Sequence, residues 1–319
     1  MRLFEHDEFE QAMLRAAERF AVSEQFVEKD YYVTEILRIV AERLGDKVMF
    51  KGGTSLSKGW GLINRFSEDI DLFVNPEGFD PRPGVNKMDR ILKDLSRSVA
   101  LHPALTWLEE GATVGGFGRE DYFQYDPRFG ELPGIRPAVR LEPGIQSGAF
   151  PTQLLPITSM VGQYLLEEGR GDMADDLTGF DMVLLHFRRT FVEKLFALHG
   201  KVVRLVNEGH PIGRHARHYS DLYALSDQSE VRSMLASGEY EEIRRDYDQT
   251  SRGSKYLARI YRPPNDLSFA DSPALFPDQA LKDQLARDYE HECRVLFSGA
   301  GYPSFDEVLG RFEELRNLL

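Results

Sequence analysis

The sequence predicts an α+β fold, in which a small mixed sheet flanked by helices is followed by a mainly α-helical second half. Short apolar runs of strand type alternate with helical patterns as far as about residue 157, and helical periodicity dominates from residue 158 onward. A Gly-Gly pair directly after the first strand-like run indicates a sharp turn. The 319 residues are enough for two ordinary domains, which we expect at residues 1–157 and 158–319.

The first forty-odd residues predict two helices. Phe9, Met13 and Phe20 recur at helical spacing, and Ser23 is a typical N-cap for a second helix that Gly45 closes. Strands are expected at residues 48–50, 70–74, 106–114, 121–125 and 135–142. Further helices are expected at residues 87–100, 159–168, 187–207, 215–225, 229–235, 239–250, 278–298 and 306–318.

Composition excludes several classes of protein. The net charge of −13 and the pI of about 5.2 argue against a nonspecific nucleic-acid coat. The single cysteine, Cys293, excludes an internal disulfide framework and a cysteine-based zinc site. No run approaches the roughly 18–20 apolar residues of a membrane helix, and the acidic N-terminus has no signal-peptide core. We therefore expect a cytoplasmic protein without a membrane partner.

One segment departs from this acidic background. Between His186 and His218, seven basic residues stand against two acids, and five of the eight histidines lie there. The basic residues are Arg188, Arg189, Lys194, Lys201, Arg204, Arg214 and Arg217. A basic segment in an acidic chain suits a bound polyanion. We therefore interpret Arg188, Arg189 and Arg217 as candidate contacts to RNA or phosphate.

The segment with the clearest chemistry runs from Gly52 to Val74. A strand ends in two glycines, hydroxyl residues can cap a short helix, and a second strand carries Asp69 and Asp71 on one face by the period-2 rule. Glycines let backbone amides approach phosphate oxygens, and a helix N-terminus favours bound anions. Two carboxylates on one strand face can hold divalent ions for an in-line phosphoryl displacement.

Mg²⁺ is the expected ion, with Mn²⁺ as a substitute, because every ligand would be an oxygen atom. Glu142, at the end of a predicted strand, is the candidate third carboxylate. An Asp-x-Asp alone is more often a solvated strand end, and a Gly-Gly alone is more often a turn. Their order and spacing favour the functional interpretation.

The run KGGTSLSKGWGLINRFSEDIDL closely resembles the first motif of the AbiEii/AbiGii (MenT-like) toxin family of nucleotidyltransferases, in the DNA polymerase β-like superfamily. Four other stretches, before and after this run, resemble further motifs of the family and occur in the same order. The resemblance covers about residues 27–225. These stretches are Val27–Thr34, Arg136–Pro143 with Ile157–Ser159, Arg189–Leu195 and Arg217–Tyr223. The last ninety residues carry no matching motif.

The resemblance implies a polymerase β-like core and assigns roles to individual residues. It implies that Asp69 and Asp71 are catalytic metal ligands, that Lys194 contacts the triphosphate, and that Asp221 is a further essential acid. It places Glu142 at the third-carboxylate position. The implied nucleotide-binding residues are Lys51, Gly52, Gly53, Thr54, Ser55 and Arg65.

The same resemblance implies a toxin of a toxin–antitoxin or abortive-infection system. Its reaction would move an NMP from an NTP onto an RNA acceptor, at the 3′ end of tRNA, and so block translation until a cognate antitoxin acts. Two alternatives stay open: transfer to a protein or a small molecule, and an inactive module that only binds nucleotide. The intact Asp69, Asp71, Lys194 and Asp221 count against the inactive module.

Several residues allow both a functional and an ordinary structural interpretation. Ser67 is a candidate regulatory phosphosite, because a phosphate there would add negative charge beside the metal carboxylates; an ordinary turn serine is the alternative. Arg189 and Glu193, at i and i+4 of a helix, form either a surface ion pair or a pair that orients groups near the phosphates. His215 and His218 are expected to be helix residues rather than zinc ligands.

Overall fold

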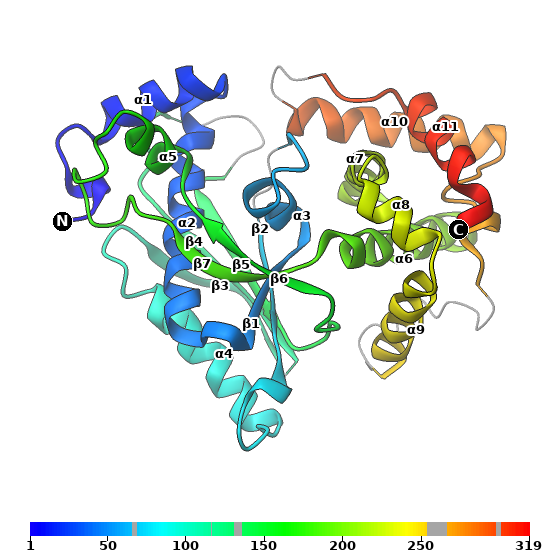
Figure 1. Ribbon diagram of the computed structural model, residues 1–319, viewed down its shortest axis with the longest axis horizontal. Coiled ribbons are helices and arrows are strands. Elements are labelled where there is room, and N and C mark those ends of the chain that lie inside the picture. Colours follow the sequence, from blue (N-terminus) through cyan, green and yellow to red (C-terminus); the bar gives the residue numbers. More distant parts are fainter. Residues whose placement is uncertain (66–68, 116, 131–135, 254–266, 298–300) are drawn as a thin grey trace. The chain divides into compact units, whose positions relative to one another are not determined.

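The computed structural model describes residues 1–65, 69–115, 117–130, 136–253, 267–297 and 301–319 (Figure 1). The chain forms two compact units. Unit 1 comprises Met1–Gly61, Phe66–Ile145 and Thr152–Leu185, and unit 2 comprises Leu62–Arg65, Gln146–Pro151 and His186–Leu319. Unit 1 is a mixed α/β structure and unit 2 is helical, so the predicted fold class is confirmed.

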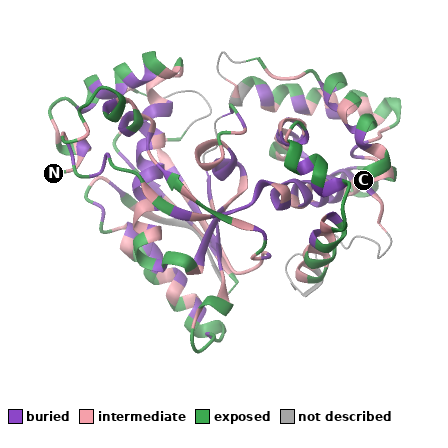
Figure 2. Ribbon diagram, viewed as in Figure 1, coloured by how far each residue is buried: buried purple, intermediate pink, exposed green. Residues whose placement is uncertain are grey.

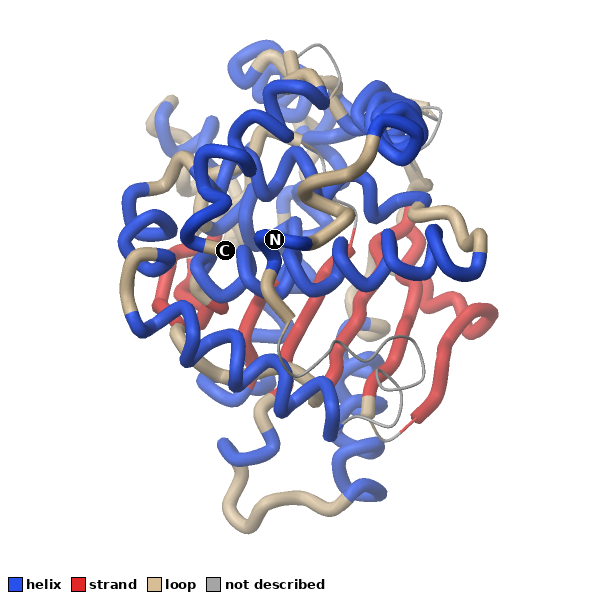
Figure 3. The backbone as a smooth tube through the Cα atoms, turned by 90° about the vertical axis from the view of Figure 1, so that its right-hand side faces the viewer, coloured by secondary structure: helices blue, strands red, loops and turns tan. Residues whose placement is uncertain are grey.

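Unit 1 is built on a seven-stranded mixed sheet with the order β3-β4-β5-β2-β1-β7-β6 (Figure 3). The strands are β1 (Val48–Lys51), β2 (Asp69–Val74), β3 (Thr106–Gly115), β4 (Gly118–Gln124), β5 (Ala138–Gly144), β6 (Thr152–Ile157) and β7 (Phe180–Leu185). The β1–β7 and β2–β5 pairs are parallel, and the other neighbours are antiparallel.

Five helices accompany this sheet. They are α1 (Phe9–Phe20), α2 (Glu24–Leu44), α3 (Gly52–Thr54, continued by a π-helical turn over Ser55–Gly59), α4 (Val85–Val99) and α5 (Met160–Glu167). Helices α2 and α4 contact the sheet, and their apolar side chains join those of the central strands in one core. Short 3₁₀ turns cover Leu3–Glu5, Gly45–Lys47 and Pro76–Gly78.

The two faces of the sheet differ in chemistry. On β5, Val139 and Leu141 are fully buried in the core, whereas Arg140 and Glu142 between them are half-buried. The same alternation on β2 buries Ile70 and Leu72 in the apolar core. Because side chains alternate across a strand, the polar residues of β2 and β5 share the face opposite the core.

Unit 2 is organised around α6 (Phe187–Glu208), which is buried along most of its length (Figure 2). The other helices are α7 (His218–Ser226), α8 (Ser229–Leu235), α9 (Gly238–Gly253), α10 (Gln279–Leu296) and α11 (Phe305–Leu315). Short 3₁₀ turns cover Gly213–Arg217, Phe269–Asp271 and Arg316–Leu318. Tyr219 packs edge-on against Phe305 and Tyr289, so α7, α10 and α11 share an aromatic core.

The contacts divide the chain at Leu185 and His186, whereas the sequence suggested a border near residue 157. The difference comes from β6 and β7, which the sequence interpretation did not identify as strands. The apolar run of β7 lies after helix α5, inside a region of helical texture, and only its pairing with β1 reveals it as part of the sheet. Among the described residues, no helix is long and apolar enough to span a membrane.

Candidate functional site

The Gly-Gly turn lies where β1 ends and α3 begins, beside the start of β2. The hydroxyl of Thr54 donates to the backbone carbonyl of Asp69 at 2.5 Å, and that of Ser55 donates to the carbonyl of Gly52 at 3.0 Å. Both side chains are buried. The predicted turn and strand are therefore joined, but the two hydroxyls hold the turn together and leave phosphate contacts to its backbone.

Asp69 and Asp71 lie on β2 opposite two charged residues of β5. The register pairs Asp69 with Arg140 and Asp71 with Glu142. The guanidinium of Arg140 donates to both oxygens of Asp69, from Nε at 2.9 Å and from Nη2 at 2.5 Å. Glu120 of β4 completes the group, with its Oε1 accepting from Arg140 Nη1 at 3.2 Å.

We call Asp69, Asp71, Glu120 and Glu142 the carboxylate face of unit 1. Four carboxylates here meet one arginine. Burial raises the pKa of Glu142 to about 7, and the charge of Asp71 adds to this effect. Two cations, Arg140 of β5 and Lys51 of β1, which the register sets opposite Asp71, share this face with the carboxylates.

Gly52 makes room for one of these carboxylates. A Cβ atom at this position would lie 2.0 Å from Oδ2 of Asp71, and Gly52 has a φ of +76°. The backbone conformation and the close approach of Asp71 both require glycine. The turn and the second aspartate are thus packed directly against each other, as a shared site for phosphate and metal demands.

The donor set of this face fits a hard divalent cation, because all of its potential ligands are oxygens. Oε1 of Glu142 is buried and makes no well-aligned hydrogen bond, although it lies 2.7 Å from Arg140 Nε. In the described part of the chain, no three acidic, histidine or cysteine side chains already converge as ligands of one ion. Arg140 explains this, since it lies among the carboxylates where an ion would bind.

The second cluster of predicted residues lies in unit 2. Asp221 of α7 is fully buried and accepts from Arg65 at 2.6 Å (Nε to Oδ1) and 2.8 Å (Nη2 to Oδ2). Lys194 of α6 donates to Oδ2 of the same carboxylate at 2.7 Å. Lys194 Nζ also lies 3.2 Å from Nδ1 of His218. The motifs on α6 and α7 therefore meet through one aspartate.

Burial and neighbouring charges together shift the pKa values of this cluster. Burial by itself would raise the pKa of Asp221, but the charges of Arg65 and Lys194 outweigh it and hold this pKa well below its usual range. Burial and the neighbouring Arg65 lower the pKa of Lys194, while Asp221 opposes them. Burial also keeps the pKa of His218 well below its ordinary value, so the ring is neutral. Arg65 and Lys194 both donate to the carboxylate of Asp221.

Two predicted site residues, Arg65 and Asp221, lie together in unit 2. Arg65 belongs to unit 2 and the turn of Lys51 to Ser55 belongs to unit 1, and the role of Arg65 in nucleotide binding stays a prediction. Asp221 holds Arg65 and Lys194 in place with both of its oxygens. Its position is that of an anchor for two cations.

The basic segment of residues 186–218 is less exposed than its composition suggests. Arg189 is 1% exposed and is bound inside unit 2 by Glu193, Asp246 and the carbonyl of Phe150. Arg188 pairs with Glu239 at 2.8 Å. Arg217 is half-buried at the end of its 3₁₀ turn. Contact of these arginines with RNA stays a prediction. Arg189 and Glu193 do form an ion pair, but it is buried and is not the surface pair that was one of the two alternatives.

Several other polar and aromatic residues take structural places, and one candidate lies outside the described residues. Tyr31, Tyr32 and Tyr219 are buried in the two cores. Nδ1 of His215 lies 3.3 Å from Nε2 of His218. The candidate phosphosite Ser67 lies outside the described residues.

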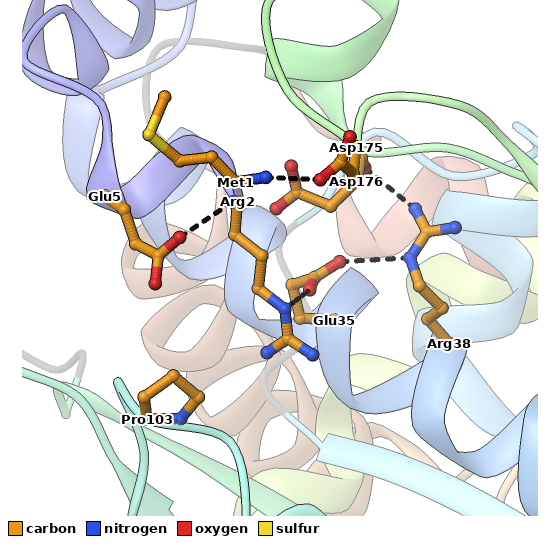
Figure 4. Close-up of a pocket in the computed structure, with 8 residues that line it drawn as sticks. All are labelled: Met1, Arg2, Glu5, Glu35, Arg38, Pro103, Asp175 and Asp176. Atoms are coloured by element: carbon orange, nitrogen blue, oxygen red, sulfur yellow. Dashed lines mark hydrogen bonds and ion pairs between the residues drawn. The ribbon is translucent and has the colours of Figure 1, made fainter.

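A pocket of about 360 Å³ in unit 1 lies between the N-terminal segment and α2 (Figure 4). Most of its charged groups pair with one another, although Nη1 of Arg2 is buried without a hydrogen-bond partner. Arg38 donates to Glu35 at 3.1 Å and to the carbonyl of Asp176 at 2.8 Å, and the Met1 amino group pairs with Asp175. These contacts tie the N-terminal segment to α2, so we assign this pocket a structural role.

Sequence reasoning missed Arg140 and Glu120. The signal for Arg140 was present, because it stands two residues before Glu142 on a predicted strand and so must share its face. Glu120 had no comparable signal, because its position depends on how β4 pairs with β5.

Comparison with known proteins agrees with this geometry. The family described as "Nucleotidyl transferase AbiEii toxin, Type IV TA system" matches residues 35–311. Among solved structures, the chain is similar to MenT4, a nucleotidyltransferase toxin from Mycobacterium tuberculosis H37Rv, with a TM-score of 0.53 and 16% sequence identity over 96% of this chain and 95% of that one. At this identity the similarity concerns the fold. No curated protein matches the chain.

Proposed function

Because this chain belongs to the AbiEii family of nucleotidyltransferase toxins of type IV toxin–antitoxin systems, we propose that it transfers an NMP from an NTP to the 3′ end of tRNA in a Mg²⁺-dependent reaction. Transfer at that end would block aminoacylation and hence translation, and a cognate antitoxin would restore growth. NTPs and tRNA are both present in the cytoplasm, where we place the reaction.

One observation carries the proposal: Asp69 and Asp71 share a sheet face with Glu142 and lie beside a glycine turn against which Asp71 packs. This face combines negative charge with oxygen ligands, which is what a divalent cation requires. Mg²⁺, or Mn²⁺ in its place, would neutralise the phosphates and lower the pKa of the attacking hydroxyl.

The chemical step is an in-line displacement. The oxygen of the acceptor hydroxyl forms a bond to the α-phosphorus, the bond from that phosphorus to the oxygen of the β-phosphate breaks, and pyrophosphate leaves. Asp69 and Asp71 would hold the ion, with Glu142 as a third carboxylate. The backbone amides of Gly53 and Thr54 would bind phosphate oxygens, since the two hydroxyls and the amide of Ser55 are used within the turn.

In unit 2, Lys194 is the proposed cation for the triphosphate. Its ammonium group is a compact point charge, and Asp221 fixes its position at 2.7 Å. A phosphate of the NTP would meet Lys194 as a cation that Asp221 holds in place. The role of Asp221 is therefore to position Lys194 and Arg65.

The acceptor is tested by incubating the purified chain with each of the four NTPs, labelled at the α-phosphate, together with total RNA and total protein. We expect label on RNA of tRNA size, and loss of that label after removal of the tRNA 3′-terminal nucleotide. Label on protein or on small molecules alone would replace RNA as the acceptor.

The control for this assay is Asp71→Asn, which keeps the size of the side chain and removes its charge. We expect transfer to fall by more than about a thousandfold, because several kcal/mol of metal-dependent stabilisation are lost. Transfer that persists in Asp71→Asn, or that is insensitive to EDTA, would contradict the metal assignment.

A further inference from the structure

Arg140 occupies the centre of the carboxylate face and contacts three of its four members. Its fork holds both oxygens of Asp69, its Nη1 reaches Glu120, and its Nε lies 2.7 Å from Oε1 of Glu142. A bidentate contact between guanidinium and carboxylate is a strong, directional interaction. This one cation therefore organises most of the carboxylate face.

A divalent ion on the same face would need the same oxygens. Mg²⁺ binds its ligands at about 2.0–2.1 Å in near-octahedral geometry. The fork of Arg140 already engages both oxygens of Asp69, and the positive charge of the guanidinium would repel an ion held a few ångströms away. Each oxygen of Asp69 has a further lone pair, but the positive charge of the guanidinium opposes a cation there, so pairing with Arg140 and ligation of a metal ion by Asp69 compete.

We propose that Arg140 is a competing cation, which neutralises Asp69 in the metal-free enzyme and weakens the binding of a divalent ion to this carboxylate. The inference rests on the proposed function, in which Asp69 and Asp71 hold the ion. Its consequence is that the resting enzyme binds a bare divalent ion more weakly than its four carboxylates would otherwise allow.

The surroundings of Arg140 permit such an exchange. Its side chain is 21% exposed, and the side chains of Glu120 and Glu142 are about as open. When the ion takes up Asp69 and Glu142, the guanidinium keeps Glu120 as a carboxylate partner at 3.2 Å and is not left as an uncompensated charge. The exchange therefore moves Arg140 from one existing ion pair to another.

The test measures Mn²⁺ binding to the full chain without nucleotide, by the electron paramagnetic resonance signal of free Mn²⁺. We expect Arg140→Gln to bind Mn²⁺ more tightly than the wild type, on the order of tenfold, because one nearby positive charge is removed. The matched control is Arg97→Gln, which makes the same change in net charge on the exposed surface of α4, where Arg97 pairs with Asp94. Its affinity should equal that of the wild type.

A second readout is thermal unfolding. Without metal, Arg140→Gln should unfold at a lower temperature than the wild type, because the carboxylates repel one another, and Mn²⁺ should raise its unfolding temperature by more than it raises that of the wild type. Arg140→Lys keeps the charge but lacks the fork, so its Mn²⁺ affinity should lie between the two. This variant keeps the proposal testable if Arg140→Gln folds poorly.

The outcomes separate this inference from the proposed function. Unchanged or weaker Mn²⁺ binding in Arg140→Gln and Arg140→Lys, with Asp71→Asn still abolishing it, would overturn the inference and leave the metal site in place. Absence of Mn²⁺ binding from every variant would overturn both. Tighter binding in Arg140→Gln that is lost again when Asp71→Asn is added would support both.

Discussion

Each unit of this protein holds an aspartate in the fork of an arginine, and the two pairs differ mainly in burial. In unit 1, Arg140 is paired with Asp69, and the arginine side chain is 21% exposed. In unit 2, Arg65 is paired with Asp221, and their side chains are 1% and 0% exposed, respectively. The donor–acceptor distances are nearly the same, at 2.5–2.9 Å in the first pair and 2.6–2.8 Å in the second.

This difference in burial indicates which of the two arginine–aspartate pairs can separate. An arginine that remains near water and has other carboxylates within reach can leave its partner at modest cost. A fully buried pair cannot, because each charge would be left without solvent or partner. The first pair thus suits a site where ligands exchange, and the second suits a rigid support for Lys194.

The largest expected effect comes from making the same substitution in both pairs. Asp221→Asn leaves Arg65 and Lys194 as buried, uncompensated cations, so the free energy of unfolding should fall by about 3–5 kcal/mol. Asp69→Asn should cost about 1 kcal/mol, because Arg140 retains Glu120 and Glu142. Urea unfolding measures both. Equal losses of stability in the two variants would contradict the distinction between an exchangeable and a fixed pair.

Lys194 is expected to serve binding more than stability. Lys194→Ala removes a charged contact to the triphosphate, so the KM for the NTP should rise by roughly 10- to 100-fold. Mn²⁺ affinity measured without nucleotide should stay at the wild-type value, since Lys194 is not part of the carboxylate face. If the variant lost metal affinity and nucleotide affinity to the same extent, the triphosphate role would be wrong.

Unit 2 should lose stability as the pH falls from 7 to 5. Burial lowers the pKa of His186, His199 and His215 to about 4, from an ordinary value of 6.5. The unfolded chain therefore binds more protons than the folded chain between pH 6.5 and 4, so the stability present above pH 6.5 is lost as the pH falls through this window. We expect about 1–2 kcal/mol for each histidine.

Histidine variants test this pH dependence. His199→Gln should flatten the dependence of the unfolding free energy on pH, and His210→Gln, at an exposed position, should leave it unchanged. The measurement is urea unfolding at a series of pH values. An equally steep loss in His199→Gln and the wild type would show that this buried ring is not one of the responsible groups.

The smallest expected effect concerns the glycine turn. Gly52→Ala places a Cβ atom against Asp71 and forces a positive φ on alanine, so we expect a stability loss of about 1 kcal/mol and a fall in transfer of about tenfold or more. Gly45→Ala is the matched control, because it has a φ of +55° and open space around it. If both glycine variants lost similar stability but only Gly52→Ala lost transfer activity, the effect on transfer would be located at Asp71. Full transfer activity in Gly52→Ala would show that the turn is not part of the functional site.

The sequence by itself determined the local parts of this protein. The period-2 pattern of β2 placed Asp69 and Asp71 on one face, and helical spacing located most helices of both units. The Gly-Gly break after β1 marked the turn that packs on Asp71. These features depend on backbone preferences and side-chain alternation over a few residues, which are properties of the chain near each position.

Only the tertiary structure decided which charges meet. The pairing of β5 with β2 set Arg140 against Asp69, and the packing of α6 on α7 brought Lys194 to Asp221. It also buried Arg189, which the sequence presented as a basic surface residue. Such contacts depend on register and burial between segments far apart in the chain, and electrostatic interactions change with both far more than local conformation does.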